Sequence, residues 1–203
     1  MVLSDRADAV DYYERDAAGF AARYDSVSFA AVHPLLGRYL PARGAALDIG
    51  AGSGRDARAL AAHGLDVTAV EPAAGFREIG AASDPGIRWI DDRLPDLARL
   101  ADARRFDLIL CSAVLMLVPP TDLTASLVNM AGLLAPGGRI VINIRRPMPG
   151  EPVDIFFAHS DAEILAAVAA AGLVCLDLAE ARDALGRETY HWRSFIFERA
   201  RTA

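Results

Sequence analysis

The stretch ALDIGAGSGRDARALAAHG, residues 46–64, places three glycines within five positions, between an apolar run and an alanine-rich segment. The apolar run that ends at Ile49 predicts a strand, and the residues between Gly54 and Gly64 predict a helix. Glycines let the backbone turn sharply between the two and leave room for a ligand, because they have no Cβ. The stretch therefore predicts a nucleotide-cofactor site, although such loops serve dinucleotides, phosphates and adenosyl cofactors alike.

Short apolar runs recur along the rest of the chain, and amphipathic stretches lie between most of them. This alternation is typical of βαβ units on a parallel sheet. The expected strands span residues 45–49, 66–70, 87–90, 106–111, 139–144, 174–178 and 192–197. Because residues 179–191 contain no convincing helix, we expect the last strand to return antiparallel beside the sixth. The sequence predicts an α/β, Rossmann-like fold with a seven-stranded, mostly parallel sheet, an antiparallel last strand and helices on both faces.

Helix ends and chain length set the expected domain organisation. Ser53 precedes Asp56 at capping-box spacing, and Ser160 with Glu163 opens a helix that Gly172 closes. Residues 7–40 carry a looser helical pattern, broken at His33-Pro34. A chain of 203 residues suits one domain. We therefore expect a single domain over residues 1–203, with a helical lead-in or cap at 1–40 and a Rossmann-like core at 45–203.

Composition narrows the classes of partner. The formal net charge of −6 would repel phosphate backbones, so nucleic acid is not an expected partner. No apolar run approaches the ~20 residues that span a bilayer, and the N-terminal residues do not resemble a signal peptide. We expect a soluble, cytoplasmic protein with no membrane partner. All 21 basic residues are arginine, which excludes Schiff-base chemistry and a Walker-type phosphate lysine.

The cysteines and histidines predict neither a disulfide nor a metal site. Cys111 and Cys175 each lie in an apolar run, where a reduced and buried thiol is the usual occupant. The four histidines and two cysteines show no ligand spacing. We expect both thiols to be buried and no metal to be bound.

Acidic residues stand at the expected carboxyl ends of the first three strands. Asp48 precedes the glycine loop, and Arg55 stands where a dinucleotide fingerprint would have its third glycine. A pyrophosphate would be repelled by Asp48, whereas a ligand with an ammonium and a sulfonium would be attracted. Glu71 can accept hydrogen bonds from both hydroxyls of a ribose. Asp91 and Asp92 can accept from an adenine amino group, and the alternative is that both are solvated turn residues.

Taken in order, these segments resemble the class I S-adenosylmethionine-dependent methyltransferases over about residues 40–145. Residues 48–54 correspond to the glycine-rich first motif of that family, and residues 133–142 to its characteristic turn and fifth strand. The resemblance implies S-adenosyl-L-methionine as the cofactor. It also implies cofactor contacts at Asp48, Gly50, Ala51, Gly52, Gly54, Glu71, Pro72, Asp91, Asp92, Arg93 and Ser112. Asp92 is favoured over Asp91 for the adenine, because the family commonly has a short segment ending in Leu-Pro after that residue.

Two departures from the family bear on the methyl acceptor. Residues 111–114 read Cys-Ser-Ala-Val, where members that act on nucleobase amines or glutamine often carry an Asn-Pro-Pro-Tyr type segment. Residues 115–117 lack the histidine of many small-molecule members. We expect a small-molecule acceptor, with residues 145–160 as a substrate lid. Two other functions stay open: an NAD-dependent oxidoreductase, and a non-catalytic adenosylmethionine-binding subunit that positions a partner.

No catalytic residue is identified, since methyl transfer needs a dedicated base only when the nucleophile arrives protonated. The candidates are Tyr24, His33, Arg145 and His159. The two histidines stand before helices or turns, where surface histidines are ordinary. Other residues expected near the same mouth are Tyr12, Tyr13, Arg146, Asp183, Arg187, His191 and Trp192.

Overall fold

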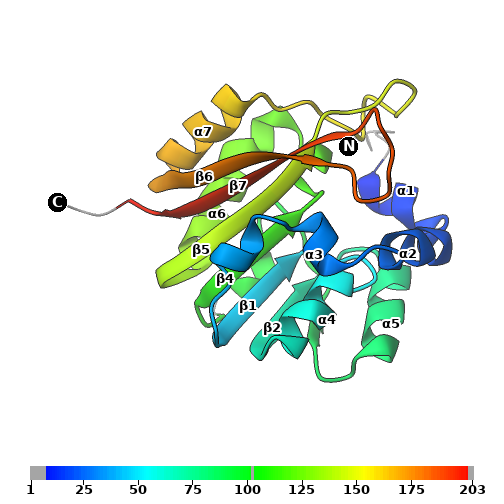
Figure 1. Ribbon diagram of the computed structural model, residues 1–203, viewed down its shortest axis with the longest axis horizontal. Coiled ribbons are helices and arrows are strands. Elements are labelled where there is room, and N and C mark those ends of the chain that lie inside the picture. The colour runs from blue at the N-terminus through cyan, green and yellow to red at the C-terminus, as the bar shows by residue number, and fades with distance from the viewer. Residues whose placement is uncertain (1–7, 102, 201–203) are drawn as a thin grey trace, which may run out of the picture.

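The structure is a computed structural model that describes residues 8–101 and 103–200 (Figure 1). Its strands are β1 Gly44–Ile49, β2 Leu65–Val70, β3 Arg88–Ile90, β4 Phe106–Ser112, β5 Leu134–Arg145, β6 Leu173–Arg182 and β7 His191–Arg199. Its α-helices are α1 Ala9–Glu14, α2 Ala17–Asp25, α3 Phe29–Val32, α4 Arg55–Ala62, α5 Ala74–Ser83, α6 Leu123–Leu133 and α7 Asp161–Ala170. Short 3₁₀ helices are η1 Leu36–Arg38, η2 Ala98–Leu100, η3 Leu115–Leu117 and η4 Pro120–Asp122.

The strands form one seven-stranded sheet in the order β3-β2-β1-β4-β5-β7-β6. Strands β1 to β5 are parallel to one another, and β7 is antiparallel to both β5 and β6. Helices α6 and α7 cover one face of the sheet, and α4 with the segment from α3 to η1 covers the other (Figure 1). The predicted fold, including the antiparallel last strand and the helices on both faces, is confirmed.

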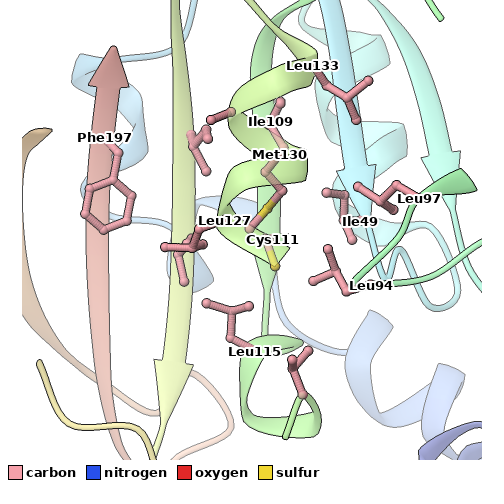
Figure 2. Packing of buried hydrophobic residues seen from close by; sticks show 14 of the residues in the cluster. Ile49, Leu94, Leu97, Ile109, Cys111, Leu115, Leu127, Met130, Leu133 and Phe197 are labelled. Atoms are coloured by element: carbon pink, nitrogen blue, oxygen red, sulfur yellow. The ribbon is translucent and has the colours of Figure 1, made fainter. Parts of the chain in front are cut away.

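Alternation along the central strands sends apolar side chains to both faces of the sheet. In β4, Ile109 and Cys111 belong to the core under α6 and α7, whereas Leu108 and Leu110 belong to the core under α4. Figure 2 shows Leu127 of α6 among the side chains that pack on the first of these faces. A central parallel strand covered on both faces reads as a continuous apolar run, which is why β4 was recognisable in the sequence.

The last three strands are longer than predicted. β5 begins at residue 134 instead of 139, and β6 runs over residues 173–182 instead of 174–178. The extension of β6 contains alanine, glutamate and arginine, which have low strand propensity, but it pairs with β7 over its whole length. Pairing in the hairpin therefore overrides local preference. The prediction that Cys175 is buried is wrong, because this residue is exposed on the edge strand β6. Cys111 is buried as expected.

One predicted helix cap is wrong and one is confirmed. Helix α4 begins at Arg55 after Gly54, which has a φ of +86° and no side-chain capping bond. Ser53 instead donates its hydroxyl to Asp25 Oδ1 at 2.7 Å, so it joins the end of α2 to the glycine loop. Ser160 forms the predicted capping box at the start of α7.

The predicted lead-in consists of short helices, of which α2 packs on α5 through a small apolar cluster around Phe76. Residues 1–7 of the lead-in, residue 102 and residues 201–203 lie outside the described residues. The N-terminal helices and the sheet edge beside the glycine loop are thus held together by side-chain packing.

A glycine in α5 is required by close packing, and this yields a stability prediction. A Cβ added at Gly80 would lie 2.1 Å from Trp89 Cζ2, so Gly80→Ala should destabilise the protein by about 1–3 kcal/mol through overpacking. Gly132 in α6 has no atom within 4 Å of its added Cβ. Gly132→Ala is therefore the matched control and should stabilise by about 0.5–1 kcal/mol. Urea denaturation of both variants measures the difference, and equal effects would contradict the packing argument.

Candidate functional site

A cavity of about 630 Å³ opens at the carboxyl ends of β1, β2, β4 and β5. Its wall combines the glycine loop, the residues that follow these strands, helices α1 and α2, the loop 146–160 and the β6–β7 connection. This volume lies within the range of about 300–1,000 Å³ that is typical of small-molecule sites. The predicted site residues that line it are Asp48, Gly50, Ala51, Gly52, Glu71, Pro72, Asp92, Arg93 and Ser112.

Two predicted cofactor contacts do not line the cavity. Gly54 lies against the ring of Trp89, which would be 2.9 Å from an added Cβ. Asp91 faces Arg77, whose Nη1 is 3.3 Å from Asp91 Oδ1. Gly54 thus serves the packing of the loop, and Asp91 is the half-exposed partner of an arginine.

Backbone hydrogen bonds hold the glycine loop against the end of β2. The N–H groups of Gly50 and Ala51 both donate to the carbonyl of Val70, at 2.8 and 3.0 Å. Gly50 and Gly52 have φ values of +66° and +56°, which favour glycine. A Cβ on Gly50 would also lie 2.3 Å from Val114 Cγ2. The loop therefore needs glycine for its conformation, and at Gly50 for space as well.

Glu71 is buried beside this loop, with both carboxylate oxygens bound to backbone. Its Oε2 accepts from the N–H of Gly52 and its Oε1 from the N–H of Ala73, each at 2.9 Å. Burial raises the pKa of Glu71, while the two backbone hydrogen bonds oppose that shift. Each oxygen has lone pairs beyond the one it already uses. The carboxylate is thus held rigidly and can still accept from two neighbouring hydroxyls of a ligand.

Asp48 is the least satisfied carboxylate in the cavity wall. Its exposed fraction is 2%, and its Oδ2 has no hydrogen-bond partner among the described residues. Burial raises the pKa of Asp48 well above its ordinary value, and the charge of Asp56 raises it further, while Arg55 opposes the shift. An unpaired buried carboxylate oxygen is costly unless a ligand supplies a donor or a positive charge. Asp48 therefore suits a cationic ligand group.

Asp92 is fixed by backbone at the rim of the same cavity. Its Oδ1 accepts from the N–H of Arg93 at 2.9 Å and its Oδ2 from the N–H of Arg99 at 2.7 Å. Arg93 in turn pairs with Asp8 at 2.8 Å and so connects this turn to the residue before α1. Asp92 is therefore both a structural turn residue and part of the cavity wall.

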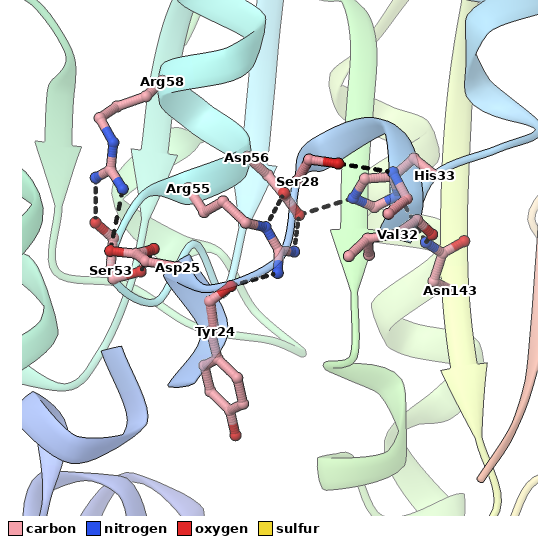
Figure 3. A network of polar contacts seen from close by, with 11 residues as sticks. Tyr24, Asp25, Ser28, Val32, His33, Ser53, Arg55, Asp56, Arg58 and Asn143 are labelled. Carbon is pink, nitrogen blue, oxygen red and sulfur yellow. Dashed lines mark hydrogen bonds and ion pairs between the residues drawn. The ribbon is translucent and has the colours of Figure 1, made fainter. Parts of the chain in front are cut away.

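A buried polar network lies behind the cavity and includes His33 (Figure 3). His33 Nε2 lies 2.8 Å from Asp56 Oδ2, and its Nδ1 lies 2.6 Å from Asn143 Nδ2. Arg55 donates to both oxygens of Asp56, at 2.7 and 2.9 Å, and to the carbonyl of Tyr24 at 3.1 Å. Because Asn143 Nδ2 donates to Nδ1, the proton of a neutral His33 is on Nε2 and points at Asp56.

Neither candidate histidine is where the sequence predicted. His33 and His159 have exposed fractions of only 3% and 2%, so the expectation of surface histidines is wrong. His159 Nε2 lies 3.0 Å from the carbonyls of both Leu115 and Val118. Both imidazole rings are buried and lie within hydrogen-bond distance of other groups of the protein, and neither ring lines the cavity. Their geometry is that of structural connectors between elements.

Arg145 and Tyr24, the other two candidates, both line the cavity. Arg145 donates to Glu151 through two nitrogens, at 2.6 and 2.8 Å, and its guanidinium lies over the rings of Phe156 and Tyr190. This bidentate pair ties the loop 146–160 back onto the end of β5. Arg145 is thus already occupied by a carboxylate of the protein.

The remaining candidates near the mouth are divided between wall and scaffold. Tyr13, Asp183, Arg187 and Trp192 line the cavity, whereas Tyr12, Arg146 and His191 do not. Asp183 accepts from Arg187 and from the indole N–H of Trp192, so the β6–β7 connection is held by its own ion pair.

The described part of the chain contains neither a helix that could span a membrane nor a cluster that could bind a metal. None of the helices in residues 8–101 and 103–200 combines the length and apolar character needed to cross a membrane. Within those residues, no three His, Cys, Asp or Glu side chains are grouped as a metal site requires.

A model of the family described as "Methyltransferase domain" matches residues 47–140, which run from the glycine loop to the fifth strand. Over these residues the chain matches a methyltransferase domain, and its sheet order is that of the class I S-adenosylmethionine-dependent methyltransferase fold. No curated protein matches it significantly in sequence.

Solved structures share the fold of this methyltransferase at low sequence identity. One is the 1,6-didemethyltoxoflavin-N1-methyltransferase of Burkholderia thailandensis, with a TM-score of 0.68 and 22% identity over 95% of this chain and 85% of that one. Another is the magnesium protoporphyrin IX methyltransferase of Synechocystis, with a TM-score of 0.71 and 14% identity over 96% of this chain and 100% of that one. The N-methyltransferase NodS of Bradyrhizobium japonicum has a TM-score of 0.69 and 19% identity over 96% of this chain and 100% of that one.

Sequence reasoning missed two buried residues in the wall of the methyltransferase cavity. Asp56 was interpreted as part of a helix cap, and Asn143 lies within a strand that reads as apolar. A polar side chain inside a run such as Ile-Val-Ile-Asn-Ile was the available signal, since a buried strand position occupied by asparagine needs a hydrogen-bond partner. The partner itself, His33, lies 110 residues away and has no local signature.

Proposed function

We propose that this methyltransferase transfers a methyl group from S-adenosylmethionine to a small-molecule acceptor, with Asp48, Glu71 and the glycine loop as the main cofactor contacts. The observation that carries the proposal is Asp48 Oδ2, a buried carboxylate oxygen in the cavity wall without a partner among the described residues. A donor is missing at this point, and the ammonium of the cofactor's methionine moiety supplies one.

The charges around this position suit a cationic cofactor. Asp48, Asp56 and Glu71 are buried carboxylates in the cavity wall, and Arg55 is the arginine that neutralises part of them. In a site of low dielectric such a surplus of negative charge attracts cations strongly. When bound, the cofactor supplies an electrophilic methyl group on a sulfonium. Asp48 would hold the ammonium of its methionine moiety and Glu71 the hydroxyls of its ribose. The glycine loop would let the cofactor approach the backbone, because its glycines have no Cβ.

Several observations support a small molecule as the acceptor. The cavity is walled by the loop 146–160 and the β6–β7 connection, which leaves a pocket rather than an open groove for a polymer. The similar structures include enzymes whose names give a toxoflavin precursor and a magnesium porphyrin as substrates. The surplus of acidic residues in the chain does not favour a nucleic-acid acceptor.

Calorimetry and a transfer assay test the proposed function. S-adenosylhomocysteine should bind to the purified protein, and NADH should not. Transfer of a radiolabelled methyl group from S-adenosylmethionine to members of a small-molecule panel then tests catalysis by the chain alone. Binding of NADH in place of S-adenosylhomocysteine would support an oxidoreductase instead. Cofactor binding without transfer to any panel member would favour the non-catalytic subunit.

Glu71→Gln should weaken binding of S-adenosylhomocysteine by about tenfold, because one strong acceptor is replaced by an amide that cannot accept from both sides. The matched control is Glu78→Gln, since Glu78 is an exposed carboxylate on α5 that does not line the cavity. Calorimetric titration of both variants gives the comparison. An unchanged affinity in a folded Glu71→Gln protein would remove Glu71 from the proposed site.

A further inference from the structure

We propose that the acceptor is an uncharged, planar aromatic molecule, an inference that rests on the proposed function. The part of the cavity beyond the glycine loop is walled by aromatic side chains from separate segments. These are Tyr13 of α1, Tyr24 of α2, Phe157 of the loop 146–160 and Trp192 of β7. Flat rings from several directions form the complement of another flat ring, through stacked and edge-on contacts.

Two arginines in this part of the cavity are already paired within the protein. Arg145 is bound by Glu151 at 2.6 Å, and Arg187 is bound by Asp183 at 2.6 Å. Burial alone would raise the pKa of Asp183, but hydrogen bonds from Arg187 and Trp192 lower it to about 2. A carboxylate or phosphate of an acceptor would therefore have to compete with a carboxylate of the protein for either arginine. Breaking either pair would leave a charge without its partner.

Two charged residues of this wall are exposed, and they are of opposite sign. Arg182 and Asp154 both line the cavity and are solvent-exposed. Charges in contact with water are screened and select a ligand weakly. On the cofactor side, Arg55 is paired with Asp56. That side therefore offers an anionic acceptor no unpaired cation.

The wall also carries two neutral polar groups, the hydroxyls of Tyr13 and Tyr24. Burial raises the pKa of both Tyr13 and Tyr24, so both hydroxyls stay protonated at neutral pH. Protonated hydroxyls can donate to a carbonyl oxygen or a ring nitrogen and can also accept from a ring N–H. Figure 3 shows the ring of Tyr24 directed away from the Arg55–Asp56 pair, while the backbone carbonyl of Tyr24 accepts a hydrogen bond from Arg55. The backbone of Tyr24 is thus anchored through Arg55, and its hydroxyl is hydrogen-bonded with that of Tyr13, so the two tyrosines present their hydroxyls to a ligand as a pair.

The transfer itself needs no charged acceptor. A nitrogen or oxygen of the aromatic acceptor forms a bond to the methyl carbon as the bond from that carbon to sulfur breaks. The sulfur keeps the electron pair, and any proton on the attacking atom passes to water. Holding the two atoms in line supplies most of the acceleration.

Binding of matched probe pairs tests the inference. The neutral members are indole, quinoline and 7-hydroxycoumarin, and the charged members are indole-3-carboxylate, quinoline-2-carboxylate and 7-hydroxycoumarin-3-carboxylate. Each is titrated at pH 6.5 into the protein saturated with S-adenosylhomocysteine. We expect at least one neutral probe to bind at least about tenfold more tightly than its carboxylate, because the carboxylate would lose its hydration without gaining a cationic partner. Equal or tighter binding of the carboxylates, or no binding of any neutral probe, would overturn the inference.

Variants separate stacking from a general loss of structure. Trp192→Leu and Phe157→Leu should each weaken the neutral probe by about fivefold or more and leave the affinity for S-adenosylhomocysteine unchanged. Arg182→Ala should leave the ratio of neutral to charged probe unchanged, and a lost preference in that variant would count against the inference. Because S-adenosylhomocysteine binding is measured separately, failure of the proposed function is distinguishable from failure of the acceptor assignment.

Discussion

Replacing Asp48 by asparagine should weaken binding of S-adenosylmethionine and S-adenosylhomocysteine by about 30- to 100-fold, the size expected for loss of a buried charge-assisted hydrogen bond. The same variant should melt at a higher temperature than the wild type when no ligand is present. The two effects have one cause, which is that Asp48 holds an unpaired carboxylate oxygen in a nearly closed environment. The charge lowers the stability of the ligand-free protein, and it raises the affinity for a ligand that places a cation beside it.

The pH dependence of the empty protein follows from the raised pKa of Asp48. A group whose pKa is higher in the folded than in the unfolded state contributes stability that is fully present below the unfolded pKa and is lost as pH rises through the folded pKa. Wild type and Asp48→Asn should therefore approach one another in stability in acid and diverge as pH rises. Thermal melts across pH, combined with calorimetric titration, measure both effects.

The matched control is Asp66→Asn, because Asp66 lies on β2 with a side chain that is 68% exposed and pairs with Arg104. This variant should change neither cofactor affinity nor melting temperature appreciably. An Asp48→Asn protein that binds the cofactor as tightly as the wild type would refute the assignment of Asp48, whatever its melting temperature.

Replacing Asp56 by alanine should lower the free energy of unfolding by about 3–5 kcal/mol, the cost of removing one member of a buried ion pair. Asp56 accepts from Arg55 at 2.7 and 2.9 Å and lies 2.8 Å from His33 Nε2. Burial would raise the pKa of Asp56, but the contacts with His33 and Arg55 lower it below its ordinary value. Without the carboxylate, the guanidinium of Arg55 keeps only the carbonyl of Tyr24 as an acceptor, and the buried imidazole N–H of His33 loses its acceptor.

Urea denaturation measures this loss, and two further variants sharpen it. Asp56→Asn keeps an acceptor for His33 but removes the charge that faces Arg55, so its loss should be smaller than that of Asp56→Ala. Asp96→Ala removes an exposed carboxylate and should change stability by no more than about 0.5 kcal/mol. A destabilisation by Asp56→Ala no larger than that of Asp96→Ala would show that the network does not stabilise the fold.

The fold and the cofactor side of the cavity were predictable from the sequence for a local reason. In a parallel sheet the carboxyl ends of the strands meet at one edge, so residues placed after successive apolar runs must come together. Asp48, Glu71, Asp92 and Ser112 lie at or just after the carboxyl ends of β1, β2, β3 and β4, and all line the cavity. The glycine loop was recognisable because its positive φ values favour glycine at fixed positions of a strand-to-helix turn.

Other features depend on contacts between distant segments and were decided by the tertiary structure. The length of β6 is one example, since this strand extends as far as its pairing with β7. The start of α4 is another, since Ser53 donates to Asp25 instead of capping the helix. The burial of His33 and His159 belongs here as well.

By itself, the sequence determined the positions of the strands along the chain, the glycine loop and the acidic residues at the strand ends, because these follow from periodicity and from backbone geometry within a few residues. Only the tertiary structure decided that His33 meets Asp56 and Asn143, and that Arg145 is occupied by Glu151. The physical reason is that a buried charge or polar group takes whichever partner the packed chain brings within hydrogen-bond distance, and separation along the sequence does not specify that partner.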